Sequence, residues 1–210
     1  RSHPTAGQHW QAYRWTEDLG FEHLGVLQNG DHPEDQLASD AFATTPDGSV
    51  LVGTTGHVSS TSAMRWTREG GMQLLPPGPH DILRGRATDV DRTGRTIVGD
   101  GTIRTRGTDG SYAFEDAVLV WRDGEIHVLR VLLESMGVDL AGWQLEEAVA
   151  VSWDGLTIAG NGTDPYGVRQ GWIAVIPEPS TALLVSLGLC GLARTREVRW
   201  PSGADAYSRS

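Results

Sequence analysis

A pattern of thirteen residues occurs three times in this chain and constrains its fold more than any other feature. Residues 41–53, 87–99 and 148–160 align without gaps, and each copy begins with Ala and ends with Gly. The centre of each copy is a turn pair: Asp47-Gly48, Thr93-Gly94 and Asp154-Gly155. Glycine accepts a positive φ and apolar β-formers flank each pair, so every copy predicts a short β-hairpin.

A second type of hairpin, marked by tryptophan, alternates with the first. The tryptophans recur about every fifty residues. They are Trp15, Trp66, Trp121 and Trp172. Because aromatic side chains bury a large area, we expect them to be packing anchors of the repeat. Two hairpins per repeat give four strands in about fifty residues, which is the size of a propeller blade.

These repeats predict an all-β fold, a propeller-like array of four-stranded units within residues 1–176. About three blades are expected, near residues 10–76, 84–130 and 147–176. A short helix is expected over residues 127–136, ended by Gly137 in the left-handed conformation. The first tryptophan hairpin has no turn-type hairpin before it, so we expect further repeats upstream of Arg1.

The chain continues into a tail with three parts. The first part is Pro177-Glu178-Pro179-Ser180-Thr181, in which two prolines favour an extended spacer. An uncharged apolar run follows over residues 182–193, then the basic residues Arg194, Arg196 and Arg199 and a polar end over residues 200–210. The run predicts a short C-terminal helix of about 20 Å, shorter than the hydrocarbon core of about 30 Å. Arginines after it suit a positive-inside end.

The order of these three parts resembles the PEP-CTERM sorting tail over residues 177–199. That resemblance implies an exported bacterial surface or matrix protein, held by membrane lipid and cut near Pro177–Thr181 by an exosortase-type sorting enzyme. It also implies a host that makes an extracellular polysaccharide. The short apolar run and residues 200–210 depart from the family pattern, and the alternative is a core helix after a proline linker. No apolar leader follows Arg1, so we expect a missing or processed N-terminus.

Residues 10–176 resemble the HAF family of extracellular repeats. The residues that carry this resemblance are Gly71-Met72 after the second tryptophan, Ser152-Trp153-Asp154-Gly155, and the stretch 131–143, which is similar to the family's terminal blade. The resemblance implies an extracellular β-repeat domain.

Composition excludes several classes of partner and site. The net charge is -10, which argues against nucleic acid, because phosphate binding needs a positive face. The single cysteine, Cys190, excludes a disulfide framework and a cysteine metal site. We expect neither cofactor nor metal.

Candidate chemistry in the loops is sparse. Asp89, Asp91, Thr93 and Asp100 loosely fit a calcium loop. A polar turn is favoured instead, because Thr93-Gly94 is already the hairpin turn of the repeat and Ala43 and Ala150 stand where Asp89 does in the other copies. His57 with Ser59, Ser60 and Ser62, or His80-Asp81, would suit a hydrolase, but no Gly-x-Ser-x-Gly motif supports either. Glu146-Glu147 are candidate paired acids or a solvated strand start. Trp10 and Trp143 are candidates for a surface contact.

These observations predict a non-catalytic, exported protein of the cell surface or extracellular matrix. We expect it to bind exopolysaccharide or another envelope component through loops of its β-repeats. A propeller-type hydrolase or lyase and a structural spacer are the alternatives. An enzyme would need charged residues at matching positions of several blades. Arg14 and Arg65 match each other, but Leu119 or Val120 breaks that series.

Overall fold

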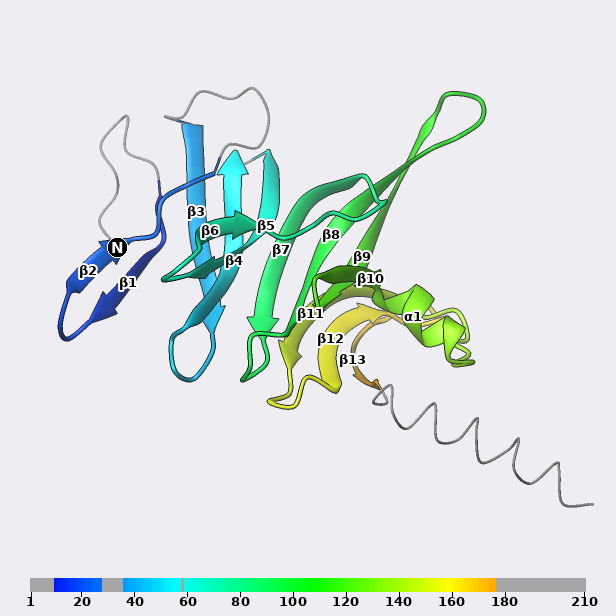
Figure 1. Cartoon of the computed structure of the whole chain (residues 1–210). Helices are drawn as coiled ribbons and strands as arrows, with labels where there is room; N and C mark the ends of the chain where they lie inside the picture. The colour runs from blue at the N-terminus through cyan, green and yellow to red at the C-terminus, as the bar shows by residue number, and fades with distance from the viewer. Residues whose placement is uncertain (1–9, 28–35, 58, 177–210) are drawn as a thin grey trace, which may run out of the picture. The chain divides into compact units, whose positions relative to one another are not determined.

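The computed structural model describes residues 10–27, 36–57 and 59–176 of the chain. Nearly every element there is a strand, which confirms the predicted all-β fold (Figure 1). The tail over residues 177–210, with its expected helix, lies outside the described residues. In chain order the elements are β1 (Tyr13–Thr16), β2 (Gly20–His23), β3 (Leu37–Thr44), β4 (Val50–His57), β5 (Ser60–Thr67), β6 (Gly71–Leu74), β7 (Ile82–Val90), β8 (Thr96–Arg106), β9 (Tyr112–Arg122), β10 (Glu125–Val128), α1 (Leu129–Ser135), β11 (Gln144–Val151), β12 (Thr157–Thr163) and β13 (Arg169–Val175).

The strands form open antiparallel sheets in which chain neighbours pair. Two sheets have four strands, in the orders β3-β4-β5-β6 and β10-β9-β8-β7. A three-stranded sheet has the order β11-β12-β13, and β1 pairs with β2 alone. Each turn-type hairpin therefore pairs with the tryptophan strand that follows it. For this reason the unit expected near residues 10–76 consists of two separate sheets, β1–β2 and β3–β6.

The three aligned copies share a β-bulge that the alignment did not reveal. Ala41 pairs with Gly53 and Ala43 with Val52, which leaves Phe42 as an extra residue on β3. The same shift lies between Ala87 and Asp89 on β7 and between Ala148 and Ala150 on β11. A bulge lets the backbone of one strand approach its partner closely, which explains the closing glycine of each copy.

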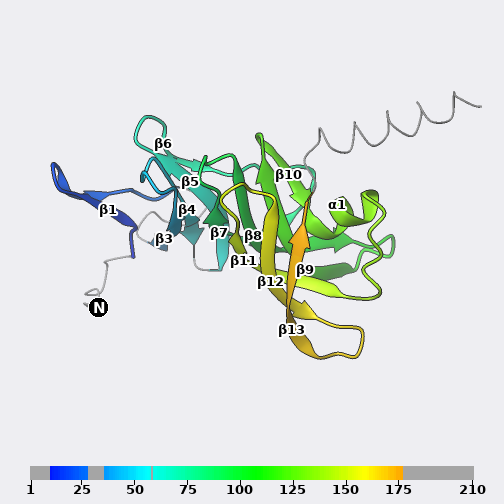
Figure 2. The same cartoon turned by 90° about the horizontal axis from the view of Figure 1, so that it is seen from below.

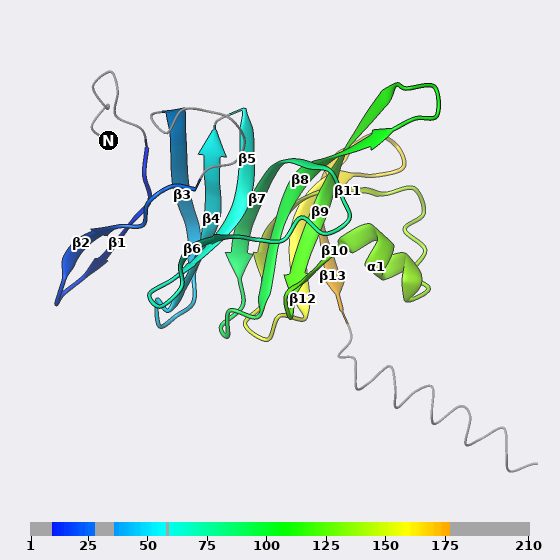
Figure 3. The same cartoon turned by 45° about the horizontal axis from the view of Figure 1, so that its top comes forward.

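Apolar clusters lie between successive sheets, which follow one another in chain order (Figures 2 and 3). Ala12 and Leu24, which flank β1–β2, pack with Met64 and Trp66 of the next sheet. Residues Val50, Val52 and Ala63 pack against Ala87, Leu119 and Trp121. A third cluster joins Val98, Val118 and Val120 to Leu145, Ala148 and Ile158. Burial of such side chains contributes about 1.5–3 kcal/mol each.

The repeat tryptophans differ in burial. Trp66 and Trp121 are buried, and Trp172 is half-buried against the core. Each of these three contacts a cluster shared with the preceding sheet. Trp15 is 60% exposed, so the prediction that it anchors packing was wrong. Its face of β1–β2 has no described sheet against it.

The helix α1 is shorter than expected. It begins at Leu129, because His127 and Val128 extend β10 and pair with Val120 and Leu119. Leu129 and Leu133, one turn apart, are buried in the cluster beside β11. At its end Gly137 has φ 83°, and its N–H donates to the Glu134 carbonyl while the Val138 N–H donates to that of Leu133. These two bonds form a Schellman motif at the expected glycine.

Candidate functional site

The three repeat turns share one hydrogen-bonding scheme. Gly48, Gly94 and Gly155 all take a positive φ, between 65° and 74°. A carboxylate and a hydroxyl two residues apart bond each other across each turn, as Thr45 with Asp47, Asp91 with Thr93, and Ser152 with Asp154. The same carboxylates accept main-chain N–H bonds, from Ser49, Thr93 and Leu156 respectively. These bonds lower the pKa of Asp47 to about 2, with the Thr45 hydroxyl as the largest cause. The turns are thus held by their own side chains.

The residues of the loose calcium motif point to different partners. Asp91 folds its own turn, as described above. Asp89 accepts a bond from the Val151 N–H at 2.8 Å, which ties β7 to β11. Asp100 pairs with Arg86. Within the described ranges no cluster of three or more His, Cys, Asp or Glu side chains is arranged to hold a metal ion.

Two residues considered for a hydrolase site, His57 and Asp81, have polar partners in the structure. His57 Nδ1 is 2.7 Å from the Ser59 hydroxyl, in the exposed turn between β4 and β5. Asp81 forms an ion pair with Arg104 at 2.7 Å. Of the surface candidates, Trp10 is 53% exposed and Trp143 is half-buried.

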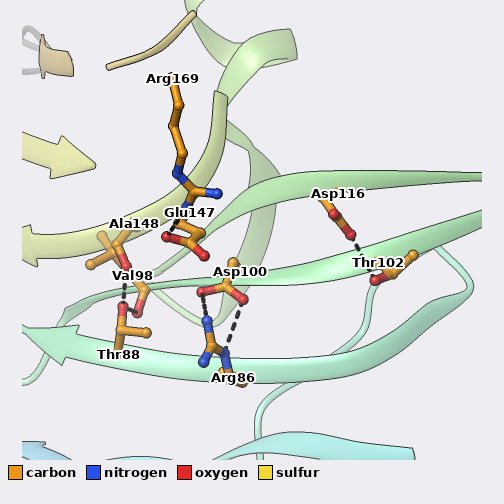
Figure 4. Close-up of polar contacts among 9 residues, drawn as sticks. All are labelled: Arg86, Thr88, Val98, Asp100, Thr102, Asp116, Glu147, Ala148 and Arg169. Atoms are coloured by element: carbon orange, nitrogen blue, oxygen red, sulfur yellow. Dashed lines mark hydrogen bonds and ion pairs between the residues drawn. The ribbon is translucent and has the colours of Figure 1, made fainter. Parts of the chain in front are cut away.

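A polar cleft gathers charged side chains from two sheets, β10-β9-β8-β7 and β11-β12-β13 (Figure 4), and Thr61 of a third sheet also lines it. It encloses about 360 Å³. Strands β5, β7, β8, β9, β11 and β13 contribute to its lining, which is Thr61, Arg84, Arg86, Asp100, Gly101, Thr102, Asp116, Glu146, Glu147 and Arg169. Three arginines and four carboxylates nearly balance in charge, and two hydroxyls accompany them.

The pair Arg86 and Asp100 forms the floor of this cleft. Arg86 donates two bonds to Asp100, from Nε to Oδ2 and from Nη2 to Oδ1, each 3.0 Å long. Burial raises the pKa of Asp100 above its ordinary value, and the bonds from Arg86 offset part of that effect. The Asp100 carboxylate raises the pKa of Arg86, so this guanidinium stays charged. A bidentate pair of this kind holds both side chains in one orientation.

A second ion pair forms the wall contributed by β11 and β13. Arg169 Nη2 lies 2.8 Å from Glu147 Oε2, and its Nη1 lies 3.8 Å from Glu146 Oε2. The Thr163 hydroxyl donates to Glu146 Oε1 at 2.7 Å. The adjacent acids are therefore part of one hydrogen-bonded network.

The remaining charged residues of the cleft, Arg84 and Asp116, do not belong to these two ion-pair networks. Arg84 is exposed and has a φ of 54°, a backbone conformation that costs energy for a residue with a side chain. Asp116 accepts a bond from the Thr102 hydroxyl at 2.9 Å. Among the described residues, Arg84 forms no ion pair and is available to a ligand.

The repeat itself positions two of these charges. Arg86 and Glu147 each directly precede the repeat alanine, and Asp40 holds that position on β3. Beside them the bulge residue Thr88 donates to the Ala148 carbonyl at 2.8 Å, which joins the two sheets. In the search for charged residues at matching repeat positions, the sequence analysis considered Arg14 and Arg65. It did not consider the position directly before the repeat alanine. The sequence signal that could have found this position is a charged residue directly before the repeat alanine in all three copies.

Comparison with known proteins adds no assignment to this geometry. Neither a protein-family model nor a curated protein matches the chain.

Proposed function

We propose that this is a non-catalytic, exported protein of the cell surface or extracellular matrix, which binds a polyhydroxylated envelope polymer in the polar cleft. The arrangement of the cleft carries this proposal. Its carboxylates accept hydrogen bonds, its guanidiniums donate them, and its threonine hydroxyls do both. A sugar hydroxyl also donates and accepts, and bonds to charged partners are the stronger ones.

The charge of the cleft supports a glycan over other ligand classes. Three arginines against four carboxylates offer no positive surface for a nucleic acid backbone. The polar lining also differs from the mostly apolar pockets that hold drug-sized molecules. An exopolysaccharide of the producing bacterium fits a cleft that is polar and has no positive surface.

We further propose that the sheets are blades of a propeller-like array. Support comes from the common strand order of successive sheets and from the repeat tryptophans, three of which pack toward the preceding sheet. Inner strands β7 and β11 then present Arg86 and Glu147 at one edge of the array.

Residues 177–199 would direct the chain to an exosortase-type sorting enzyme and to membrane lipid. Support for this part is the sequence alone, since residues 177–199 lie outside the described residues. Among the residues that the structure describes, no helix is long and apolar enough to cross a membrane. Intact-mass measurement and C-terminal peptide mapping on membrane and medium fractions of the native host test it. A terminus near Pro177–Thr181 is expected, and an uncleaved cytoplasmic chain ending at Ser210 would exclude sorting.

Titration of the purified chain with the host's own exopolysaccharide tests the binding proposal. We expect Arg84→Ala and Asp116→Ala each to weaken binding about tenfold, the loss of roughly one charge-assisted hydrogen bond. Arg68→Ala is the matched control, because Arg68 pairs with Glu22 outside the cleft. Equal affinity of all variants would place binding elsewhere.

A lyase or hydrolase is the second candidate, favoured by one observation. Asp100 has a raised pKa inside the cleft, a property shared with catalytic acids. Both of its oxygens accept bonds from Arg86, which favours a binding role instead. Release of reducing ends or unsaturated products from the polymer, lost in Asp100→Asn, would establish the enzyme.

A further inference from the structure

The hairpin of β8 and β9 is longer than the sheet to which it belongs. Each of these strands has eleven residues. Strand β7 pairs with β8 only as far as Ile103, and β10 pairs with β9 only over Leu119–Arg122. Beyond them, residues 104–106 and 112–114 have no strand partner but each other among the described residues, and they project from the sheet (Figures 1 and 3). We call residues 104–114 the arm. The sheets that pack against the two faces of this sheet, β3–β6 and β11–β13, are both described.

One face of the arm carries two aromatic side chains. Tyr112 and Phe114 are 51% and 61% exposed, and they lie two residues apart on β9, so they share a face. The guanidinium of Arg104, on the neighbouring strand, lies 5.1 Å from the centre of the Tyr112 ring. This cation–π contact holds the ring on that face, where it stays half-exposed. Neighbouring exposed rings with polar groups around them are typical of an interaction site.

The same face continues into the polar cleft. Asp116 is the next residue on this side of β9, and Thr102 faces it from β8, where its hydroxyl donates to Asp116 at 2.9 Å. Both residues line the cleft, and Figure 4 shows them where the two strands run on toward the arm. At about 3.4 Å per residue, Phe114 lies about 7 Å and Tyr112 about 14 Å beyond Asp116 along the strand. The cleft and the two rings are therefore consecutive parts of one surface.

Contacts at its base hold the arm in one orientation. The Arg104 main-chain N–H donates to the Asp81 carbonyl at 2.8 Å, and the Arg104 Nε donates to Asp81 Oδ2 at 2.7 Å. Glu115 alternates with Phe114 along β9, so it lies on the opposite face, and it forms an ion pair with Arg130 of α1 at 2.6 Å. The aromatic face is thus fixed before a ligand arrives, which lowers the conformational entropy that binding would cost.

We propose that the polymer extends from the cleft along the arm, with one sugar ring stacked on Phe114 and a further ring on Tyr112. This inference rests on the proposed function, because it takes the same ligand beyond the cleft. A sugar ring carries hydroxyls around its rim and C–H groups on its faces. It can therefore pair with the polar groups of the cleft and also cover an aromatic ring of the arm. The surface then selects a chain of several sugars over a single sugar, and it favours sugars with an apolar ring face.

Titration of the full chain with the host's own exopolysaccharide tests this extension. Phe114→Ala is expected to weaken binding about tenfold, the effect of about 60 Å² of apolar surface that the polymer no longer covers. Phe114→Trp keeps an aromatic ring and should bind about as the wild-type chain does. Because Phe114 is exposed, both variants should melt at the wild-type temperature. With saturating polymer, the peptide 104–114 should exchange its amide hydrogens more slowly in the wild type than in Phe114→Ala, whereas the peptide with Glu146–Glu147 should be protected in both.

Trp153→Ala is the matched control, since Trp153 is 69% exposed in the turn after β11, at the other end of that strand from Glu146 and Glu147. It is expected to bind the polymer as the wild-type chain does. Weaker binding in Asp116→Ala together with wild-type binding in Phe114→Ala would overturn the role of the arm and leave the cleft. A wild-type chain that does not bind the polymer would overturn both. Self-association of the wild-type chain that Phe114→Ala abolishes, with polymer binding unchanged, would make the arm a contact between copies and overturn the proposal.

Discussion

Gly99 on β8 faces the main-chain carbonyl oxygen of Arg86 on β7 so closely that a Cβ at position 99 would lie 1.8 Å from it. Gly53 faces the Asp40 carbonyl oxygen at the same distance, and Gly160 faces that of Glu147 at 2.0 Å. The closing glycine of the repeat is therefore a requirement of the bulge. Because Arg86 and Glu147 lie two residues before the bulge residue of their strands, the feature that defines the repeat also places charges in the cleft.

Replacing Gly99 with alanine tests this requirement. The added methyl group meets backbone rather than a flexible side chain, so we expect a loss of about 3 kcal/mol, the upper end of the usual cost of overpacking, in the free energy of unfolding. Urea denaturation measures it. Gly171→Ala is the matched control within β13, because its Cβ would find its nearest neighbour at 3.7 Å. Equal stability of the two variants would contradict the account of the bulge.

The repeat tryptophans are expected to differ in their contribution to stability. Trp121 is 4% exposed, and its Nε1 donates to the Pro76 carbonyl at 2.9 Å. Trp121→Ala should cost about 3–5 kcal/mol through a cavity and a lost hydrogen bond. Trp153→Ala, at an exposed position, should cost less than about 0.5 kcal/mol. Thermal or urea unfolding compares them, and a small effect at Trp121 would mean that it is not a packing anchor.

The repeat turns predict a dependence of stability on acid pH. Hydrogen bonds from Thr45 and Ser49 hold the folded pKa of Asp47 at about 2, below the ordinary 3.8. Its ionised form therefore stabilises the folded state above about pH 4, and this contribution is lost as the pH falls toward 2. The difference in unfolding free energy between wild type and Asp47→Ala should shrink over that interval. A difference independent of pH would refute the assignment. Asp100 makes the opposite contribution, because burial raises its pKa in the folded state. Its contribution to the free energy of unfolding therefore decreases as the pH rises and the carboxyl group ionises.

Asp89 is expected to support the junction of two sheets rather than a metal. Asp89→Ala leaves the Val151 N–H without its partner, which should cost about 1–3 kcal/mol. Addition of about 1 mM Ca²⁺, enough for extracellular calcium modules, should leave the melting temperature unchanged. Calorimetry with and without Ca²⁺ checks both statements. Stabilisation by Ca²⁺ that disappears in Asp89→Ala would restore the calcium loop.

Much of the fold followed from local sequence. The turn pairs and their spacing predicted the hairpins at Asp47, Thr93 and Asp154, because turn geometry and strand alternation depend on neighbouring residues. The end of α1 was also predictable, because Gly137 satisfies a local backbone requirement. The pairing between hairpins was harder to predict. The local sequence does not show that a turn-type hairpin pairs with the tryptophan strand that follows it.

The cleft was not predicted, for a physical reason. Its lining includes Arg86, Glu147 and Arg169, which lie far apart in the chain and meet only through stacking of sheets. The signal that Arg86 and Glu147 share, a charged residue before the repeat alanine, also fits a solvated strand face. Trp15 shows that the same local pattern can give different burial. Trp15 and Trp66 both lie between Arg and Thr, but Trp66 is buried and Trp15 is exposed. Burial of such a tryptophan depends on a neighbouring sheet, which its own hairpin does not supply.

Hydrogen exchange of the full chain, with and without the host's exopolysaccharide, tests the central claim most directly. Binding in the cleft should slow exchange in the peptides that contain Arg84–Arg86 and Glu146–Glu147, because both segments line it. The turn at residues 45–49 should exchange at the same rate in both states. Polymer binding that leaves the cleft peptides unchanged, or no binding at all, would contradict the proposed function.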